Sequence, residues 1–383
     1  MTKVAQLQED IKAYAKTIGI DKIGFTTADI FTEMKERLRR QQELKYQSGF
    51  EKGSIEERTE PQRLLPEAQS IISIAVAYPS RMEKTPRGTK GDRRGIFARA
   101  SWGIDYHVAL RERLDKLGAY IKERVPNAII KSMVDTGELS DRAVAERAGV
   151  GFSGKNTSII TKEFGSFVYL GEMLTNIPFI PDTPIEDGCG DCTICLDACP
   201  TGAIVQGGQL NAQRCIAFLT QTKDFLPEEF RNKIGNRLYG CDTCQQVCPW
   251  NKGKDSHFHQ ELEPNPELVK PKLRPMLHLS NREFKEKFGH MSGSWRGKKP
   301  IQRNVILALG HYKEQSAEED LINMMKHDPR PVIRGTAAWS LGKIGTDTAK
   351  EAISAMLEKE DNEQVLYEME NALSAMRAKQ GSQ

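Results

Sequence analysis

The sequence predicts a protein of the α+β class that combines a mixed helix–strand domain, a cysteine-rich insert and a helical repeat domain. Helical and strand-like apolar patterns alternate through the first part of the chain. All eight cysteines then fall in one short stretch, and from Pro300 onward the apolar pattern is helical only. A chain of 383 residues rarely forms a single core. We therefore expect a mixed domain at 1–180, a ferredoxin-type insert at 181–262, a basic linker region at 263–299 and repeats at 300–383.

The first domain alternates predicted helices with predicted strands. Val4–Ile18 has apolar residues at helical spacing and ends at Gly19, a common helix terminator. Ile71–Tyr78 is a continuous apolar run that Pro79 ends, as expected of a buried strand. Four further elements are expected: helices over 106–125 and 141–148, and strands over 129–134 and 166–170.

Composition and charge favour a globular protein of the cytoplasm. Charged residues make up 28% of the chain, hydrophobic residues 38%, and the formal net charge is +3. No apolar run reaches the ~18 residues that a membrane helix needs. Residues 1–10 are polar and mixed in charge, so no secretory signal is expected. Neither Arg39-Arg40 nor Arg93-Arg94 precedes an apolar segment, so no twin-arginine signal is expected either.

The first half of the cysteine stretch has the spacing of a bacterial ferredoxin. Cys189-x2-Cys192-x2-Cys195-x3-Cys199-Pro200 matches the run whose first three thiolates bind one cubane and whose fourth binds a second. Zinc is the alternative metal, but zinc sites pair one CxxC with another and leave no role for a run of three. A disulfide scaffold would spread its cysteines through a small domain. We therefore expect iron–sulfur clusters.

The second half of the stretch is Cys241-x2-Cys244-x3-Cys248-Pro249, with Cys215 standing apart. Eight cysteines supply two 4Fe–4S clusters with none left over, and the fourth cysteine of a ferredoxin run binds the other cluster. This crossover predicts one cluster on Cys189, Cys192, Cys195 and Cys248, and the other on Cys199, Cys215, Cys241 and Cys244. Since Cys215 lies outside the usual run, its assignment departs most from the pattern.

The chain from Pro300 onward contains a weak internal repeat. Asn304–Gly310 recurs as Arg334–Gly342, and aligning their Leu-Gly pairs gives a spacing of 32 residues. This length is typical of helix-pair repeats, although it is shorter than the usual HEAT unit. The alternative is a set of unrelated amphipathic helices. We expect HEAT-like repeats.

A glycine-rich part of the first domain offers a ligand pocket. Asp135 follows an apolar run and precedes a glycine turn, where its carboxyl group can face a pocket. Gly149–Gly154 allows a ligand to approach the backbone, and Lys155, Asn156 and Ser158 follow with side-chain donors. Taken alone, these residues also fit a solvated turn. No GxGxxG motif follows a strand, so a dinucleotide fold is not indicated.

Together with the cysteine runs, these segments resemble the epoxyqueuosine reductases. The resemblance rests on Asp135-Thr-Gly, Ala148–Thr157, Leu170–Thr175, Cys248-Pro-Trp-Asn251, both cysteine runs and the terminal repeats. These motifs are highly specific in combination. The family depends on cobalamin and catalyses the last step of queuosine formation in tRNA, the two-electron removal of the epoxide oxygen at the wobble position.

The resemblance implies a nitroreductase-like first domain that holds cobalamin in its base-off form. It also implies that Asp135 is the acid that protonates the departing oxygen, because an unprotonated oxygen leaves poorly. We expect burial to raise the pKa of Asp135 so that it keeps this proton. His107, in Asp105-x-His107-x-x-Leu110, lacks the glycine of the His-on corrinoid signature and is expected to be an ordinary helix residue. The expected cobalamin contacts are Arg58, Arg99, Tyr106, Asp135, Lys155, Asn156, Ser158 and Asp242.

A basic tract precedes and enters the repeats. Residues 270–303 contain ten Lys or Arg against two Glu, a local balance of +8. Trp295 lies among these charges, which suits stacking and backbone contacts with a nucleic acid, although such tracts are often only solvated surfaces. With the family resemblance, salt-sensitive binding of the tRNA anticodon stem-loop is expected. The expected contacts are Trp295, Arg296, Lys298, Lys299, Arg303, Arg330 and Arg334.

Two other functions stay open on the sequence alone. A reductive dehalogenase-like enzyme would share the corrinoid and both clusters, but such enzymes usually carry a twin-arginine leader and lack helical repeats. A non-catalytic iron–sulfur electron carrier would use the repeats to dock a partner protein. For the reductase we expect a monomer that takes electrons from a flavodoxin or ferredoxin and binds no membrane.

Overall fold

The computed structural model describes residues 2–380, which form two compact units. Unit 1 consists of the chain up to Arg81, Trp102–Cys215 and Asp242–Glu263. Unit 2 consists of Met82–Ser101, Ile216–Cys241 and the chain from Pro264 onward. Each unit is thus assembled from three separated stretches of sequence. The domain bounds expected above follow motifs rather than these units, and they stay a prediction.

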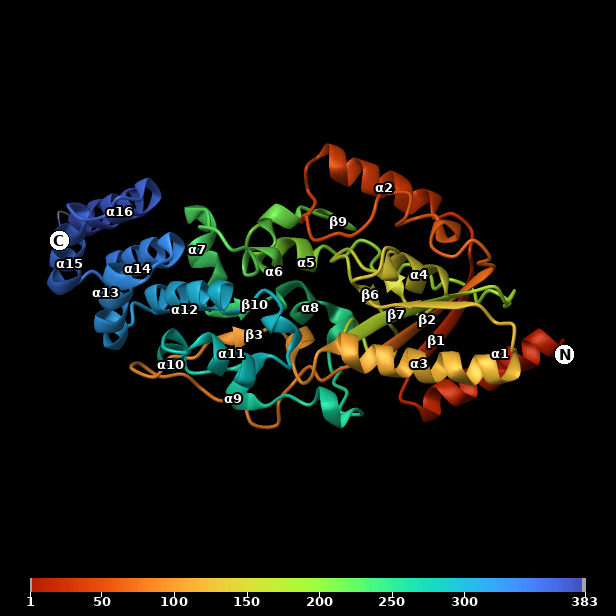
Figure 1. The fold of residues 1–383 in the computed structure, drawn as a ribbon. Helices are drawn as coiled ribbons and strands as arrows, with labels where there is room; N and C mark the ends of the chain where they lie inside the picture. The colour runs from red at the N-terminus through yellow and green to blue at the C-terminus, as the bar shows by residue number, and fades with distance from the viewer. Residues whose placement is uncertain (1, 381–383) are drawn as a thin grey trace. The chain divides into compact units, whose positions relative to one another are not determined.

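Unit 1 combines a sheet with helices (Figure 1). Its helices are α1 (Lys3–Thr17), α2 (Thr32–Glu43), α3 (Tyr106–Arg124), α4 (Asp141–Arg147), α5 (Ile194–Asp197) and α8 (Thr243–Gln246). Its strands are β1 (Lys22–Thr27), β2 (Ser70–Ala77), β4 (Ile130–Met133), β5 (Phe152–Ser153), β6 (Ile159–Ile160), β7 (Val168–Thr175), β8 (Ile204–Gln206) and β9 (Gln209–Leu210).

The main sheet of unit 1 has the strand order β1–β2–β7–β4, with every neighbouring pair antiparallel. Helices α1 and α3 cover one face, and α4 covers the other (Figure 1). The inner strands β2 and β7 are covered on both faces, which explains their nearly continuous apolar sequences. Strand β4 is an edge strand, so the loop from β4 to α4 leaves the sheet at its border.

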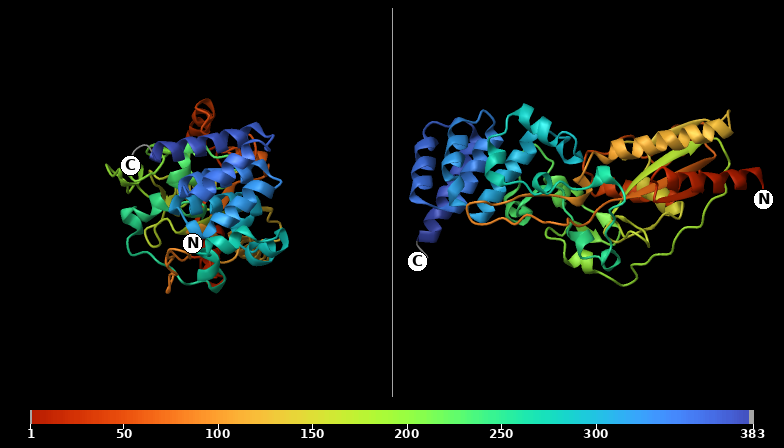
Figure 2. Two further views of the ribbon diagram at one scale, coloured as in Figure 1. Left: turned by 90° about the vertical axis from the view of Figure 1, so that its left-hand side faces the viewer. Right: turned by 90° about the horizontal axis from the view of Figure 1, so that it is seen from below.

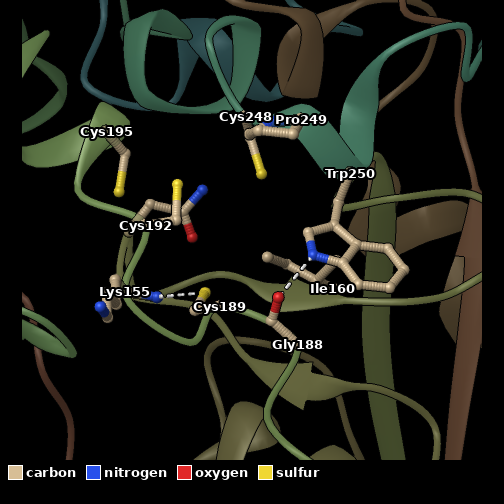
Figure 3. Close-up of a pocket in the computed structure, with 10 residues that line it drawn as sticks. Lys155, Ile160, Gly188, Cys189, Cys192, Cys195, Cys248, Pro249 and Trp250 are labelled. Atoms are coloured by element: carbon tan, nitrogen blue, oxygen red, sulfur yellow. Dashed lines mark hydrogen bonds between the residues drawn. The ribbon is translucent and has the colours of Figure 1, made fainter.

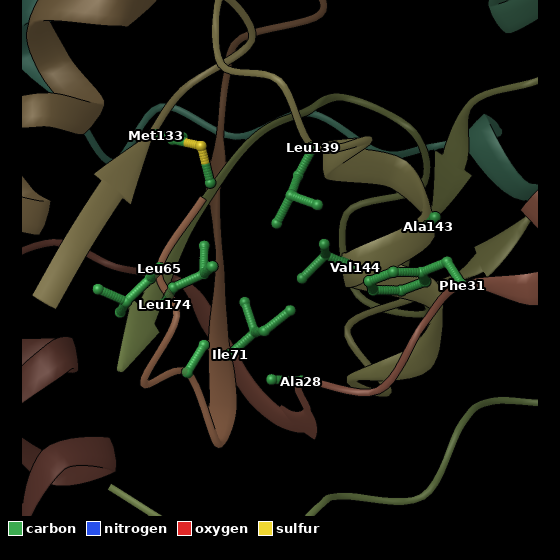
Figure 4. Packing of buried hydrophobic residues seen from close by; sticks show 10 residues of the cluster. Ala28, Phe31, Leu65, Ile71, Met133, Leu139, Ala143, Val144 and Leu174 are labelled. Carbon is green, nitrogen blue, oxygen red and sulfur yellow. The ribbon is translucent and has the colours of Figure 1, made fainter. Parts of the chain in front are cut away.

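The face of the sheet that α4 covers holds most of the core near this loop. Ile71 and Leu174 pack there against Val144 of α4, and Met133 and Leu139 join them from either end of the loop (Figure 4). A second apolar cluster continues on the same face, formed by Ala75, Ala145, Ala148, Val150 and Ile159. The loop between β4 and α4 is therefore anchored by buried side chains at both of its ends.

One polar row interrupts this apolar face. Ser73 and Glu172 lie directly opposite each other in the β2–β7 ladder and are fully buried, with exposed fractions of 1% and 0%. The apolar residues on either side of them, Ile71 and Leu174 in one direction and Ala75 in the other, share the same face because side chains alternate along a strand. A buried glutamate in such a row lowers the stability of the fold unless its carboxyl group is hydrogen-bonded or neutralised.

Unit 2 consists of helices with one short parallel strand pair, β3 (Ile96–Phe97) and β10 (Arg237–Tyr239). Its core includes Phe230, Leu307 and Trp339. Met82–Ser101 is tied in through this strand pair and through Glu314, which accepts hydrogen bonds from the Gly91 N–H and from Arg93 Nε. The helices are α6 (Ile216–Leu219), α7 (Glu228–Ile234), α9 (Pro266–Val269), α10 (Leu273–Leu277), α11 (Asn281–Phe288), α12 (Lys298–Tyr312), α13 (Glu318–His327), α14 (Pro331–Ile344), α15 (Asp347–Leu357) and α16 (Glu363–Gln380).

The helices α12 to α16 form the predicted repeats and stack side by side (Figure 2, right). The two Leu-Gly pairs found in the sequence fall in α12 and α14. A Cβ atom on Gly310 would lie 2.9 Å from Ser340 Cα, and one on Gly342 would lie 3.0 Å from Ala372 Cα. Both glycines therefore allow neighbouring helices to approach closely, which gives the repeated Leu-Gly pair a packing reason.

Most of the expected elements are confirmed, as are the α+β class and the helical repeats. Helices α1, α3 and α4 and strands β2 and β4 occur within one or two residues of their expected bounds. The strand expected at 166–170 instead runs over Val168–Thr175, and β1 and α2 were not expected. Within residues 2–380, no helix is both long and apolar enough to cross a membrane.

Candidate functional site

Asp135 lies in a tight loop just after β4. Its φ is +48°, a left-handed conformation that costs a residue with a side chain on the order of 1 kcal/mol. The loop is held there by a hydrogen bond of 2.8 Å from the Asp135 backbone N–H to Oδ2 of Asp141, the first residue of α4. This geometry turns the Asp135 side chain away from the loop and toward the start of α3.

Two residues at the start of α3 meet the Asp135 carboxylate. The Tyr106 hydroxyl donates a hydrogen bond of 2.6 Å to Asp135 Oδ2, and His107 Nε2 lies 3.5 Å from the same oxygen. Asp105 caps the helix by accepting from the His107 backbone N–H, and the same carboxylate oxygen lies 2.8 Å from His107 Nδ1. The imidazole is therefore fixed between two carboxylates. The Tyr106 ring also stacks on the Tyr169 ring of β7, with 4.8 Å between the ring centroids.

The electrostatics of this group place the proton on the histidine. Burial disfavours the charged imidazole, but Asp105 and Asp135 outweigh it and raise the pKa of His107 to about 9. The protonated His107, whose Nε2 lies 3.5 Å from Asp135 Oδ2, in turn lowers the pKa of Asp135, against the effect of burial and with help from the Tyr106 hydrogen bond. At neutral pH the structure therefore holds Asp135 as a carboxylate beside an imidazolium.

Two expectations from the sequence are corrected by this arrangement. The pKa of Asp135 is lowered rather than raised, because the charge of His107 and the hydrogen bond from Tyr106 outweigh the effect of burial on its carboxylate. His107 is not an ordinary helix residue, because its side chain is only 19% exposed and joins Asp105 to Asp135. The signal for this role was the Asp-x-His pair at the helix start, where the cap residue can also orient the imidazole.

Three residues near this loop were missed by the sequence analysis. Asp141 holds the Asp135 N–H, and Glu172 of β7 lies against Asp141. Arg142 of α4 donates to the Thr157 carbonyl oxygen, and its charge interacts with Asp135 and Asp141. The one sequence signal for this group was Glu172 itself, which stands in the middle of the apolar stretch Leu170–Thr175.

The four cysteines expected to hold the first cluster line one cavity of about 160 Å³ in unit 1 (Figure 3). The Lys155 N–H donates to Cys189 Sγ at 3.4 Å, and Trp250 Nε1 donates to the Gly188 carbonyl at 3.0 Å, closing one side. The other lining residues include Asn156, Ile160 and Pro249. A small cavity ringed by thiols and an amide donor suits an iron–sulfur cubane. The cysteines concerned are Cys189, Cys192, Cys195 and Cys248.

The expected second set of cysteines is divided between the two units. Cys199, Cys215 and Cys244 belong to unit 1, while Cys241 is the last residue of a stretch of unit 2. Cys199 Sγ accepts a hydrogen bond of 3.2 Å from the Ala203 N–H, as the thiolates of cluster ligands commonly do. Along the sequence, Cys215 directly precedes the stretch Ile216–Cys241 of unit 2, and Cys241 ends it.

The donors expected to contact cobalamin lie beside the cysteine cavity. Lys155 Nζ donates to the Gly190 carbonyl at 2.5 Å, and Asn156 Oδ1 accepts from the Ser158 N–H at 3.1 Å. Asn156 is 5% exposed, lines the cavity, and its Nδ2 has no hydrogen-bond partner. A buried amide without a partner fits an acceptor group of a bound cofactor. The Lys155 contact with Cys189 was not expected.

The remaining expected cobalamin contacts occupy three different settings. Arg58 is half-buried in unit 1, burial lowers its pKa, and Asp141 and Arg142 are among its charged neighbours. Asp242, at the start of α8, is only 7% exposed and is therefore not part of a surface turn. Arg99 belongs to unit 2, in the short 3-10 turn Arg99–Ser101.

The basic tract of unit 2 retains an exposed aromatic residue. Trp295 is 53% exposed, and the Arg296 guanidinium lies 5.0 Å from its ring centroid. Lys298 and Lys299 follow at the start of α12 and are half-buried. Two expected contacts are largely neutralised, because Arg330 pairs with Asp328 at 2.6 Å and Arg334 pairs with Glu360 at 2.7 Å.

Arg303 does not belong to an RNA-binding surface. Its side chain is buried, with an exposed fraction of 1%. Its guanidinium donates to the Leu219 and Asp224 carbonyl oxygens at 2.7 Å each and to Thr222 Oγ1 at 2.9 Å. The prediction was wrong because the position of Arg303 on α12 turns this charge into the unit, where carbonyl groups replace water.

Comparison with known families matches three parts of the chain. Residues 58–136 match the family described as epoxyqueuosine reductase QueG, DUF1730. Residues 188–251 match the 4Fe–4S double cluster binding domain, and residues 297–374 match the HEAT repeats. The first match ends in the Asp135 loop, the second covers the cysteine stretch, and the third covers the helices from α12 to most of α16.

Full-length relatives give the same result. The chain is 67% identical over 374 residues to an epoxyqueuosine reductase of Bacillus cereus, covering 98% of both chains. A crystal structure of an epoxyqueuosine reductase with an epoxyqueuosine-modified tRNA-Tyr stem loop is 64% identical, with a TM-score of 0.96 over 98% of this chain and 100% of that one. A Bacillus subtilis epoxyqueuosine reductase, with its aspartate catalytic loop swung out of the active site, has a TM-score of 0.95 at 64% identity over 97% of this chain and 100% of that one.

Proposed function

Because the chain belongs to the epoxyqueuosine reductase family, we propose that it converts epoxyqueuosine to queuosine at the wobble position of a tRNA. The conversion breaks both carbon–oxygen bonds of the epoxide, consumes two electrons and two protons, and leaves an alkene and water. The observation that carries the proposal within this structure is the Asp135 carboxylate, which is joined to a protonated His107 and to Tyr106. This group can deliver a proton to a departing oxygen.

The cofactors of this reaction are two 4Fe–4S clusters and cobalamin. The thiols that line the cavity in unit 1 would hold the first cluster, and the remaining four cysteines would hold the second. Arg58, Tyr106, Lys155, Asn156 and Ser158 would contact the corrin ring or its nucleotide tail, and the buried Asn156 amide has a free donor beside the cysteine cavity. When bound, cobalamin would supply a strongly reducing cobalt centre, and the two clusters would supply electrons to it.

The chain itself handles the proton. His107 stores one proton at neutral pH, and its Nε2 is aimed at Asp135 Oδ2. Asp135 lies at the exposed end of this pair, so we assign to it the direct transfer to the oxygen and to His107 the supply of the proton. Tyr106 orients the carboxylate by donating to the same oxygen. In this scheme the pKa of the acid is set by its partner rather than by burial alone.

The partner is a tRNA, and Trp295, Arg296, Lys298 and Lys299 form the surface of unit 2 that suits it best. A cation beside an exposed indole can contact both the RNA backbone and an unstacked base. We further propose that the enzyme works as a cytoplasmic monomer and receives electrons from a small flavodoxin or ferredoxin.

The test is a reconstituted turnover assay with a matched pair of variants. The chain is loaded anaerobically with iron, sulfide and cobalamin, reduced, and incubated with tRNA that carries epoxyqueuosine. Nucleoside mass spectrometry then follows the loss of one oxygen. Asp135→Asn should lower the rate roughly a hundredfold or more, since general acid catalysis contributes about that much. Asp29→Asn, at an exposed position before α2, should keep the wild-type rate.

Each outcome of this assay decides between functions. Conversion by the wild type, with loss only in Asp135→Asn, supports both the reaction and the acid. Conversion that survives in Asp135→Asn keeps the reaction but removes Asp135 from it. No conversion by a protein that carries both clusters and cobalamin would contradict the proposed function and leave halogenated substrates or an electron-carrier role to be tested.

A further inference from the structure

The buried acid Glu172 has no role in the proton delivery described above. A single residue, Asp141, nevertheless connects it to Asp135. Glu172 is fully buried on β7, and both of its carboxyl oxygens lack a hydrogen-bond donor in the described part of the chain. Ser73, directly opposite on β2, is also fully buried and its Oγ also has no partner. A site that served stability alone would carry an apolar residue in this row, because a buried acid without a donor destabilises a fold.

The surroundings of Glu172 leave it one partner. The carboxylate of Asp141 faces it, and a hydrogen bond between two carboxyl groups forms only when one of them carries a proton. Burial, together with the nearby charge of Asp141, raises the pKa of Glu172 well above its ordinary value. Since the pKa of Glu172 is the one raised furthest by burial, we take Glu172 as the member that carries the shared proton and Asp141 as the acceptor.

Asp141 passes this contact on to the catalytic loop. Its Oδ2 accepts the Asp135 backbone N–H at 2.8 Å, and Asp135 is held there at a φ of +48°. A residue with a side chain leaves that conformation readily unless its surroundings hold it. The chain of contacts therefore runs from the middle of the sheet, through the first residue of α4, to the backbone of the residue that meets Tyr106 and His107.

We propose that Glu172 is a positioning residue, which donates a hydrogen bond to Asp141 so that Asp141 can hold the Asp135 loop in the conformation that meets Tyr106 and His107. Loss of the proton from Glu172 would set two carboxylates against each other beneath the loop and release it. The inference deepens the proposed function and rests on it only for the role of Asp135.

Other charges facing the pair act on it from three elements. Asp135 of the loop adds negative charge to both acids. Arg142 of α4 and Arg58, in the segment before β2, add positive charge beside Asp141. From β2, the polar neighbour is Ser73, which is uncharged. The two aspartates raise the pKa of Glu172 and neither arginine lowers it, which favours the shared proton on Glu172 rather than on Asp141.

The test measures the loop directly by hydrogen exchange of the holoprotein. The protection factor of the Asp135 amide is followed by mass spectrometry on a peptide that begins at least two residues before Asp135 and extends to Ser140. Glu172→Leu removes the donor and should lower protection roughly tenfold while raising the thermal midpoint, because an apolar residue suits the site. Glu172→Gln keeps a donor toward Asp141 and should retain protection. Met173→Leu, on the opposite face of β7, controls for general disturbance of the strand.

The pH dependence separates positioning from simple packing. Protection in the wild type should fall as the pH rises through the raised pKa of Glu172, whereas Glu172→Gln has nothing to titrate and should stay protected. Single-turnover rates on the modified tRNA should follow protection, with about a tenfold or larger loss in Glu172→Leu.

Wild-type protection in Glu172→Leu, or an identical alkaline loss in the wild type and in Glu172→Gln, would overturn the proposal. The exchange readout does not need turnover. A wild type that shows the expected exchange but fails to convert the tRNA would therefore count against the proposed function alone.

Discussion

An imidazole between two carboxylates sets the chemistry at the scale of single residues. His107 is placed by its own helix cap, Asp105, and by Asp135, which lies 28 positions further along the chain. The Asp-x-His pair is visible in the sequence, but the contact with Asp135 depends on β4 ending beside the start of α3. A one-dimensional pattern does not contain that distance, so the pattern alone suggested an ordinary helix residue.

The charge of His107 predicts an alkaline limit for catalysis. Because its pKa is raised to about 9, the proton is present at neutral pH and is lost as the pH rises through that value. The rate of the wild type should fall over the same range. His107→Asn should lose roughly a hundredfold in rate and show no such alkaline decline, while His327→Asn, at an exposed position on α13, should behave as the wild type. A variant at 107 that keeps the same alkaline limb would rule out His107 as the proton source.

The same pKa predicts how stability depends on pH. A histidine whose folded pKa lies above its unfolded value of about 6.5 stabilises the fold fully below that value. This contribution is lost as the pH rises from about 6.5 through about 9. Urea denaturation at pH 6 and pH 9.5 should therefore show a smaller loss of stability in His107→Asn than in the wild type. An equal loss in both proteins would contradict the pairing of His107 with its carboxylates.

Residue types with fixed chemistry were the ones that the sequence identified best. Thiols at ferredoxin spacing have few other uses, and the first four expected ligands do line one cavity. Arginine has many uses, and Arg303 shows the consequence, since its charge serves buried carbonyl groups rather than a nucleic acid. Glu172 was missed because a glutamate within an apolar stretch suggests the end of a strand rather than a functional residue.

At the scale of elements, the periodicity of apolar residues predicted the helices and strands that bury one face. Helix α3 buries seven residues along its length and was found within a residue of its bounds. Helix α2 buries none, so its sequence has no apolar stripe, and it was not expected. The strand expected at 166–170 was placed too early because β7 continues through Gly171 and Glu172, two residues that rarely occur in buried strands.

Two helical glycines, one in the repeats and one in α3, are predicted to have opposite effects on stability when replaced by alanine. Gly342→Ala should destabilise the protein by about 1–3 kcal/mol, because its Cβ would lie only 2.7 Å from the Ala372 Cβ. Gly118→Ala in α3 meets no atom closer than 3.5 Å and should stabilise by up to ~1 kcal/mol through the loss of backbone freedom in the unfolded chain. Urea unfolding measures both. Equal effects from the two substitutions would mean that the Leu-Gly pairs have no packing role.

The crossover of cysteines predicts an unequal loss of iron from two double variants. Cys189→Ser with Cys248→Ser removes two ligands of one cluster, so about four irons should remain per chain. Cys244→Ser with Cys248→Ser removes one ligand from each cluster, because these two neighbouring cysteines are assigned to different clusters. Little iron should therefore remain. Iron analysis and electron paramagnetic resonance distinguish these results. Equal iron in the two variants would contradict the assignment.

At the scale of the whole molecule, the charge that matters is local. The net charge of +3 gives no strong attraction for a polyanion, whereas the tract that begins at Lys270 keeps an exposed Trp295 beside Arg296. Part of the +8 counted in the sequence is unavailable, since Arg303 is buried and Arg274 pairs with Asp320. The sequence could not show this, because pairing and burial depend on the packing of α12 and α13.

The local surface predicts a salt-dependent contribution to tRNA binding. Arg296→Ala and Lys299→Ala should each weaken binding and reduce the slope of log affinity against log salt concentration by about one unit. Lys326→Ala, an exposed lysine on α13, should change neither quantity. Filter binding across a series of salt concentrations provides the measurement. If the salt-dependence slope does not change in any variant, these residues do not form the RNA-binding surface.

The interleaving of the two units has a consequence for how the protein is made. Met82–Ser101 leaves the ribosome early, but its partners β10 and Glu314 are translated long afterwards, and unit 1 itself is incomplete until Glu263 has emerged. Neither unit can close while the chain is half synthesised. The nascent protein therefore keeps apolar segments of both units exposed for much of its translation, and its thiols emerge only from Cys189 onward. Cluster delivery before the C-terminal half has emerged would find only part of its ligands in place.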